Sequence, residues 1–373
     1  MKVVAAIDSF KGSMTSMEAG NAVKKGILAA KPDAEVWLSP LADGGEGTVD
    51  ALIEGLGAEK IPVTVAGPLG EKVSCYYGFL EETKTAVMEM ASAAGITLVI
   101  KKDPLRASTY GVGEMIADAL KQGCKNFMIG IGGSATNDGG IGMLKALGFE
   151  FFDEDGNDVG EGAAALAKIE VIRTENKNSL LSGAKFQIAC DVKNPLCGKQ
   201  GATYIFGPQK GVTEEQKSKV DEAMKHYADV TKESLGCDFA DCEGAGAAGG
   251  LGYAFLSYLA GELIPGVELI LQATGLEEKM KNADVVVTGE GRLDAQTVMG
   301  KAPVGVAALA KKYNAKVIAF AGSVAPEASV CNQAGIDAFF PIVRGVTTLE
   351  EAMKKENAME NIAATAEQVF RLL

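Results

Sequence analysis

The sequence predicts an α/β protein of two domains, in which one doubly wound, Rossmann-like sheet is built from both ends of the chain. Three observations support this prediction: strands and helices alternate at the start, hairpin-like strands follow residue 61, and the alternation returns near residue 283. A chain of 373 residues also has room for about two domains. We expect residues 1–62 and 268–373 to form the Rossmann-like domain and residues 63–267 to form an inserted domain with a mixed sheet.

The first domain is expected to begin with two strands and two helices. The apolar run at residues 3–7 predicts a buried parallel strand. Thr15 and Glu18 have the spacing of a capping box, which predicts the start of a helix. A second strand at residues 36–41 and a second helix at residues 48–56 complete a βαβα pattern, which is typical of a doubly wound sheet.

The sequence changes in character after residue 61. Strand-like runs separated by short turns predict antiparallel hairpins, because apolar residues alternate with others along one of the runs. The elements expected in the inserted domain are strands at 61–65, 72–79, 85–90, 126–131 and 186–190, and helices at 109–122, 142–147 and 213–235. Those expected after residue 283 are strands at 285–287, 317–321 and 338–342, a helix at 304–313, and one or two closing helices within 349–373.

The composition excludes several classes of function. The chain has 36 Lys and Arg against 49 Asp and Glu, and its net charge of −13 disfavours nucleic acid or an anionic membrane as a partner. A single histidine, His226, excludes mechanisms that need a pair of imidazoles. The seven cysteines contain no C-x-x-C pair, and the first residues have no signal-peptide core. We therefore expect a cytoplasmic protein, and we leave open whether it forms a homo-oligomer.

Glycine accounts for 46 residues and gathers in a few clusters. The pattern D-G-G-x-G-x-x-x-A-L occurs twice, starting at Asp43 and at Asp138, each time between a predicted strand and a predicted helix. Glycines at such a junction can turn backbone N–H groups toward an anion at the helix N-terminus. The alternative is a tight turn that only permits close packing, and for the first copy the two interpretations have even weight. The second copy also carries Ser134, Thr136 and Asn137, and this density of polar groups favours a function.

Two further glycine clusters are candidate ligand sites. Residues 244–249 match G-x-G-x-x-G, but residues 237–243 make a poor strand, so the match to a dinucleotide fingerprint is weak. The cluster remains a candidate phosphate loop. Residues 288–294 follow the strand at 285–287 and hold two acids and an arginine, at the end of a strand where open α/β sheets bind ligands.

Short polar segments complete the set of candidates. Residues 8–12 end the first strand with an acid, a hydroxyl and a lysine, and residues 191–195 place an acid and an amide after another strand. Residues 207–211 are expected to present Lys210 on a turn. Glycine loops, carboxylates and isolated cations together meet the needs of phosphoryl transfer, which depends on positioning and charge stabilisation. The sequence has no Walker A loop, no protein-kinase signature and no Ser–His pair.

The same segments also resemble those of a known family. In chain order they are DSFK (8–11), ADGGEGT (42–48), GPLG (67–70), GIGGSATNDGG (130–140), ACDV (189–192), IFGPQKG (205–211), GAGAAGG (244–250) and TGEGR (288–292). Together they span nearly the whole chain, which resembles the type I glycerate kinases; Gly12 and Leu293 are departures from residues common in that family. The resemblance implies a phosphotransferase with an alcohol group as acceptor, which uses ATP and Mg²⁺ to phosphorylate D-glycerate. It favours 2-phosphoglycerate over 3-phosphoglycerate as the product, and it implies a two-domain α/β architecture.

Residue roles are hypotheses from the chemistry of the candidates, with the active site in a cleft between the domains. Asp191 or Asp294 would be the general base for the glycerate hydroxyl, and Arg292 or Lys11 would pair with the glycerate carboxylate. The residues expected at the substrate are Ser9, Lys11, Asp43 and Arg292. Those expected at the phosphates of ATP are Gly132, Gly133, Ser134, Thr136, Gly139, Gly246, Gly249, Lys210 and Lys301. Those expected at Mg²⁺ are Asp43, Asp138 and Glu290.

Two other classes of function stay open. A nicotinamide-dependent 2-hydroxy-acid oxidoreductase would use residues 244–249 and would need a strand immediately before them. A non-catalytic sugar-acid binding protein would bind glycerate without turning it over. Binding of NADH would favour the first, and binding of glycerate without turnover would favour the second.

Overall fold

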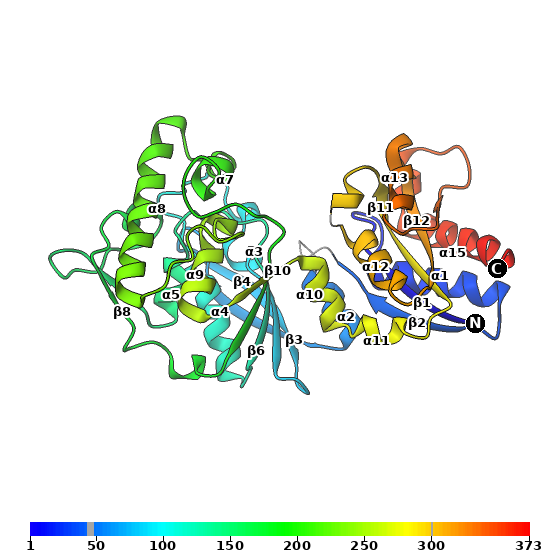
Figure 1. The fold of residues 1–373 in the computed structure, drawn as a ribbon, viewed down its shortest axis with the longest axis horizontal. Helices are drawn as coiled ribbons and strands as arrows, with labels where there is room; N and C mark the ends of the chain where they lie inside the picture. The colour runs from blue at the N-terminus through cyan, green and yellow to red at the C-terminus, as the bar shows by residue number, and fades with distance from the viewer. Residues whose placement is uncertain (43–47, 300) are drawn as a thin grey trace. The chain divides into compact units, whose positions relative to one another are not determined.

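The structure is a computed structural model that describes residues 1–42, 48–299 and 301–373. The chain divides into two compact units, each with its own sheet (Figure 1). The five-stranded unit consists of Met1–Asp43, Asp50–Gly57 and Val267–Leu373, and the six-stranded unit consists of Gly44–Val49 and Ala58–Gly266. The predicted α/β class is confirmed, because helices and strands alternate along both units.

The five-stranded sheet has the order β13-β12-β11-β1-β2, and its pairings are parallel. Its strands are β1 (Lys2–Ile7), β2 (Glu35–Pro40), β11 (Val285–Leu293), β12 (Lys316–Val324) and β13 (Ala338–Pro341). Strand β1 lies between β2 and β11, with Val3 opposite both Val36 and Val285. Both ends of the chain therefore build one doubly wound sheet, as the sequence predicts, and its strand order reverses between β1 and β11.

Helices connect the strands of this sheet, and several of them pack against it. They are α1 (Ser16–Ala30), α2 (Thr48–Leu56), α10 (Gly266–Ala273), α11 (Leu276–Met280), α12 (Ala302–Lys311), α13 (Val330–Gln333), α14 (Leu349–Met353) and α15 (Lys355–Arg371). Helices α1 and α15 share one hydrophobic core with Val3, Ala5 and Ile7 of β1. Val4 and Ala6 alternate to the opposite face and are equally buried, and α12 packs against β11 and β12.

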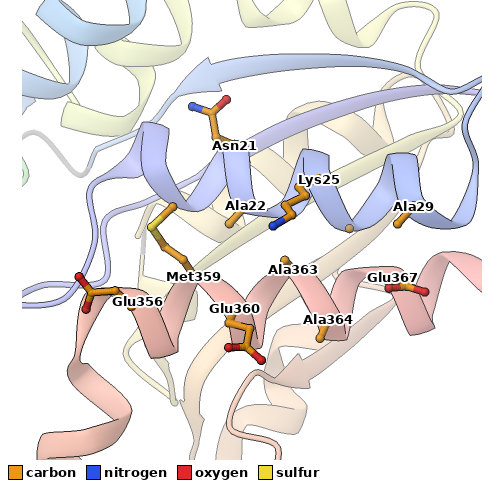
Figure 2. A pocket seen from close by; sticks show the side chains of 11 residues that line it. Asn21, Ala22, Lys25, Ala29, Glu356, Met359, Glu360, Ala363, Ala364 and Glu367 are labelled. Carbon is orange, nitrogen blue, oxygen red and sulfur yellow. The ribbon is translucent and has the colours of Figure 1, made fainter.

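Helix α1 begins at the capping box that the sequence predicts. Thr15 Oγ1 accepts a hydrogen bond from Glu18 N (3.2 Å), and Glu18 Oε2 accepts one from Thr15 N (2.9 Å). Small side chains, among them Ala22 and Ala363, lie where α1 runs beside α15 (Figure 2). Gly26 is part of this close contact, because a Cβ at that position would lie 2.1 Å from the carbonyl oxygen of Ala363.

The six-stranded sheet has the order β10-β9-β6-β5-β4-β3. Its strands are β3 (Glu59–Ala66), β4 (Lys72–Leu80), β5 (Thr85–Glu89), β6 (Asn126–Gly130), β9 (Lys185–Ala189) and β10 (Glu262–Ile264). Strands β3, β4 and β5 pair antiparallel, as predicted, whereas β5, β6, β9 and β10 are parallel. The last residues of the parallel strands, Glu89, Gly130, Ala189 and Ile264, stand in register, so the loops that follow them emerge at one edge.

The helices of the six-stranded unit enclose a second hydrophobic core. They are α3 (Ala91–Ala94), α4 (Tyr110–Lys121), α5 (Ile141–Ala146), α6 (Ala163–Leu166), α7 (Ala202–Lys210), α8 (Glu214–Leu235) and α9 (Leu251–Leu259), and β7 (Glu150–Phe152) with β8 (Val171–Arg173) forms a separate hairpin. Helix α8 buries the apolar stripe that its sequence predicts, including Val220, Met224 and Tyr227. The Tyr227 ring lies edge-on to Tyr253, with 5.6 Å between ring centroids.

Two segments differ from their predicted structure. Strand β11 continues to Leu293, so residues 288–293 are strand rather than loop, because the pairing with β12 extends to Leu293 opposite Val324. Lys210 is the last residue of α7 and is buried, rather than being presented on a turn. Residues 288–293 are rich in glycine, which lowers their intrinsic propensity for a strand. Residues 207–211 contain Pro208, which lowers their propensity for a helix. In both segments tertiary packing overrides the local propensity.

Three further features were considered from the sequence: a strand before residue 244, membrane-spanning helices and disulfide bonds. Residues 237–243 form no strand, so the G-x-G-x-x-G match at residues 244–249 lacks the strand that a dinucleotide fingerprint needs. No described helix is both long and apolar enough to cross a membrane. The seven cysteines are free thiols.

Replacing Gly26 with alanine is expected to destabilise the five-stranded unit, because the new Cβ would meet backbone atoms of α15. We expect a loss of about 1–3 kcal/mol in the free energy of unfolding, measured by urea denaturation followed by circular dichroism. Gly20→Ala in the same helix is the matched control, since its Cβ would lie 3.5 Å from a leucine methyl group, an ordinary contact. That variant should be neutral or gain up to about 1 kcal/mol. Equal losses in the two variants would contradict the prediction.

Candidate functional site

A cavity of about 590 Å³ lies at the carboxyl edge of the five-stranded sheet, where the strand order reverses. We call it the switch-point pocket. Its lining includes Asp8, Ser9, Phe10, Lys11, Glu290, Arg292, Asp294, Lys301, Ile342, Leu349 and Met353. Open α/β sheets bind ligands at this position, and the volume is within the range of small-molecule and cofactor sites. The pocket is therefore our candidate site.

Glu290 is a buried acid at this pocket. Its Oε1 accepts a hydrogen bond from Thr297 Oγ1 (2.7 Å), and its Oε2 lies 3.4 Å from Lys301 Nζ. Burial raises the pKa of Glu290 and the charge of Asp294 acts in the same direction, whereas Thr297 and Lys301 oppose the rise. The pocket thus holds a partly desolvated carboxyl group next to a lysine.

Asp294 and Arg292 form a second ion pair at the pocket. Arg292 Nε lies 3.4 Å from Asp294 Oδ2, and Asp294 Oδ1 accepts a hydrogen bond from Gln296 N (2.9 Å). The side chain of Asp294 is 17% exposed and that of Arg292 is 66% exposed. The acid is therefore fixed in place, while most of the arginine side chain faces solvent and is accessible to an anionic ligand.

The loop after β1 brings another acid and a third cation to the pocket. Asp8 is buried, and its backbone N–H donates to Gly289 O (2.9 Å), while its Oδ1 accepts from Ser9 N (2.6 Å). Lys11 is exposed, and a Cβ built on Gly291 would lie 3.9 Å from its backbone nitrogen. Residues from the two ends of the chain therefore meet at this pocket.

Part of the pocket is apolar, and we call this part the apolar wall. It includes Phe10, which is buried, and Ile342, which follows β13. It also includes Leu349 and Met353 of α14, which are 76% and 38% exposed. Sequence reasoning missed this wall, because the closing helices show no motif and their amphipathic pattern only predicts burial.

Six residues that the sequence predicts as site residues line the switch-point pocket: Ser9, Lys11, Glu290, Arg292, Asp294 and Lys301. With Asp8, which was not among the selected site residues, the pocket combines three acids with three cations. The formal charges of these six side chains cancel, whereas the whole chain carries a net charge of −13.

In the six-stranded unit the second and third glycine clusters come together. Gly139 N donates to Gly249 O (2.9 Å), and a Cβ on Gly250 would lie 2.7 Å from Gly139 Cα. Gly246 N donates to Asn194 O (2.9 Å). These glycines are buried, and their lack of a side chain permits the close approach of the backbones.

Asp138 is fully buried and holds the second glycine cluster together. Its Oδ2 accepts from Thr109 N and Thr109 Oγ1 (2.8 Å each) and from Gly142 N (3.3 Å), and its Oδ1 accepts from Gly140 N (3.2 Å). Burial raises the pKa of Asp138, and these four donors oppose the rise. Because both oxygens already accept hydrogen bonds inside the unit, we leave Asp138 out of the Mg²⁺ ligands proposed below.

Lys210, at the end of α7, hydrogen-bonds to the loop of the second glycine cluster. It is 2% exposed, and its Nζ donates to Ser134 Oγ and to the carbonyl oxygen of Thr136 (2.6 Å each). Burial lowers the pKa of Lys210 to about 7, and the charge of Asp138 opposes the fall. A neutral amine has two N–H groups, which matches these two acceptors, so the neutral form leaves no buried donor unpaired.

The exposed polar groups of this unit include several at the carboxyl edge of its parallel strands. Gly132 and Gly133 are exposed after β6, and Asp191 is exposed after β9, where its Oδ1 accepts from Gly266 N of the same unit (2.9 Å). Glu89 ends β5, and its Oε1 accepts from Val49 N (3.0 Å). Sequence reasoning did not select Glu89, because one acid at the end of a strand gives no distinguishing signal.

The predicted site residues thus fall into two groups, one in each unit. Ser134, Thr136 and Lys210 are buried, as are Gly139, Gly246 and Gly249. Asp43 and the rest of the first D-G-G-x-G copy lie outside the described residues. Within the described residues, no group of three or more His, Cys, Asp or Glu side chains is placed to hold a metal ion.

Comparisons with known proteins agree along the whole chain. A family model described as the glycerate kinase family matches residues 3–373. A glycerate kinase of Bacillus subtilis (strain 168) is 45% identical over 99% of this chain and 97% of its own length, and a glycerate 2-kinase of Escherichia coli (strain K12) is 45% identical over 98% of each chain. The crystal structure of a Salmonella typhimurium LT2 protein, provisionally assigned as glycerate kinase 2, matches with a TM-score of 0.91 and 43% identity, covering 99% of this chain and 97% of that one.

The buried Lys210 should make stability depend on pH in a defined direction. Its pKa is about 7 in the folded protein and about 10.4 in an unfolded chain. At a pH between these two pKa values, the Lys210 amine is protonated in the unfolded state and neutral in the folded state. The contribution of Lys210 to stability therefore rises with pH. We subtract the unfolding free energy of Lys210→Met from that of the unmodified protein. We expect this difference to become more positive by about 1 kcal/mol per pH unit from pH 7 to pH 9.

Urea denaturation of both proteins at each pH measures this difference. Lys225→Met, at an exposed position of α8, is the matched control and should leave the pH dependence of stability unchanged. If the Lys210 and Lys225 variants show the same pH dependence, the effect assigned to burial of Lys210 is wrong.

Proposed function

Because this chain belongs to the glycerate kinase family, we propose that it transfers the terminal phosphoryl group of ATP to a hydroxyl group of D-glycerate. The family match over residues 3–373 and the names of its relatives support this activity. The structural observation that carries the proposal is the switch-point pocket, where three acids and three cations line one cavity. Phosphoryl transfer needs cations to balance phosphate charge and a carboxylate to accept the proton of the attacking hydroxyl.

Asp294 is our first candidate for the general base. It lines the pocket, its position is fixed by the Gln296 N–H, and its side chain is still 17% exposed. Asp191 is the second candidate, because it is exposed at the carboxyl edge of the other sheet. A carboxylate in either position would take the hydroxyl proton as the oxygen attacks the phosphorus of ATP.

We propose Glu290 as a ligand for Mg²⁺ that accompanies ATP. The described residues contain no cluster of three or more ligating side chains, which fits an ion held by one or two carboxylates together with phosphate oxygens and water. Glu290 lines the pocket, and its Oε2 lies 3.4 Å from Lys301 Nζ, a longer contact than those of Asp138 with Thr109. When bound, Mg²⁺ would offset negative charge on the transferring phosphoryl group.

The finer points of the activity are also proposals. We propose 2-phosphoglycerate as the product, and the name of the Escherichia coli relative, a glycerate 2-kinase, supports this choice. The expected location of the active site in a cleft between two domains stays a prediction. A nicotinamide-dependent oxidoreductase has less support, because residues 244–249 have no strand before them and Gly246 and Gly249 are buried.

The activity is tested by incubating the purified protein with ATP, Mg²⁺ and D-glycerate and following ADP formation. Enolase added alone converts 2-phosphoglycerate, but not 3-phosphoglycerate, to phosphoenolpyruvate, whose absorbance is then measured. We expect glycerate-dependent ADP formation and consumption of the product by enolase. ADP formation without enolase-dependent absorbance would contradict the 2-phosphoglycerate proposal, and no glycerate-dependent ADP formation would contradict the kinase proposal.

We expect Asp294→Asn to lower kcat by about 100-fold or more, since the amide cannot accept the proton. The Asn side chain keeps an oxygen that can accept from Gln296 N, so the local fold should be retained. Asp229→Asn, at an exposed position of α8 that is not part of the pocket lining, is the control and should keep normal turnover. If Asp294→Asn is active and Asp191→Asn is not, the base is Asp191; if both are active, the assignment of the base is wrong.

A further inference from the structure

The switch-point pocket has apolar surface for which glycerate has no use. Glycerate carries an oxygen-containing group on every carbon, so contact with Phe10, Leu349 and Met353 would desolvate those groups without giving them partners. The volume of about 590 Å³ also suits a larger ligand. A ligand that fills this pocket should therefore have an apolar part as well as an anionic part.

The apolar wall and the cations border the same space. Met353 contacts the loop after β1, because a Cβ on Gly12 would lie 3.1 Å from its Cε, and Gly12 follows Lys11 directly. Lys301 and Arg292 line the same cavity, each next to an acid. An anionic ligand that reaches these cations would therefore place its remaining part near α14.

An adenine nucleotide combines these two chemistries. The faces of its base are apolar and gain free energy from contact with aliphatic side chains. Its phosphate chain is a polyanion of the kind that lysine and arginine bind. Leu349 is 76% exposed, so a base lying on it would remove apolar surface from water.

We propose that the switch-point pocket binds the adenine nucleotide, with the base on Leu349 and Met353 and the phosphate chain toward Lys11, Arg292 and Lys301. This inference rests on the proposed kinase function and gives it a nucleotide site. It keeps Lys301 at the phosphates, as expected from the sequence, but it departs from the expectation that the glycine clusters of the six-stranded unit also bind them. Gly139, Gly246 and Gly249 are buried there, whereas Lys11 and Arg292 are exposed.

The test measures binding of ADP and of inorganic tripolyphosphate to the full-length protein by isothermal titration calorimetry. We expect Leu349→Ser to weaken ADP binding about tenfold and to leave tripolyphosphate binding unchanged, because it removes only apolar contact. We expect Lys11→Gln to weaken the binding of both ligands about tenfold, because it removes a charge that faces phosphate.

Val346→Ser is the matched control for Leu349→Ser. Val346 is a fully exposed apolar residue three positions earlier, and it lines a neighbouring cavity with Arg344 and Asn361 rather than the switch-point pocket. This variant should bind ADP as the unmodified protein does. Because both positions are exposed, neither serine is expected to disturb folding, and thermal unfolding checks that they do not.

An ADP affinity that is unchanged in Leu349→Ser, or that falls as much in Val346→Ser, would overturn the placement of the base. Absence of ADP binding in the unmodified protein would overturn the whole inference. If the unmodified protein phosphorylates glycerate but the two pocket variants bind ADP normally, the inference is wrong and the proposed function stands. If ADP binds with the expected pattern but glycerate is not phosphorylated, the proposed function is wrong and the nucleotide site stands.

Discussion

The parallel pairing of β1 with β11 is the constraint on which the candidate site depends. Val3 opposite Val285 sets the register, and the Asp8 N–H donates to Gly289 O just beyond it. Parallel neighbours end at the same edge of a sheet, so this pairing brings the loop after β1 to the acids and cations of β11. The strand order reverses at the same place, and the connections that leave in opposite directions create room for a ligand.

The glycine clusters of the six-stranded unit act in another way. There the backbones of Gly139 and Gly249 hydrogen-bond directly, and the side chains of Asp138 and Lys210 bond inward. Burying Asp138 and Lys210 costs free energy, and hydrogen bonds to backbone and hydroxyl groups offset much of that cost. These hydrogen bonds favour one arrangement of the loop, because losing them would leave the buried side chains of Asp138 and Lys210 unpaired.

Much of the fold could be predicted because its signals are local. The capping box at Thr15 and Glu18 begins α1, and the apolar stripe of α8 is buried as its periodicity predicts. The site was predicted in part: the charged residues of 8–11 and 288–294 stand out beside glycines at strand ends. The apolar wall was not, since Leu349 and Met353 belong to a short helix whose residues resemble any amphipathic surface. The burial of Lys210 was also missed, because its partners come from a loop more than 70 residues earlier in the chain.

The sequence alone determined the α/β class, the use of both chain ends in one sheet, and the family, because periodicity, capping residues and ordered motifs are properties of the chain itself. The tertiary structure decided which of the polar residues are accessible. Glycine-rich segments that look alike in sequence became a buried backbone contact in one unit and a pocket edge in the other. The physical reason is that burial depends on which distant segments pack against a loop, and residue types within the loop do not encode those partners.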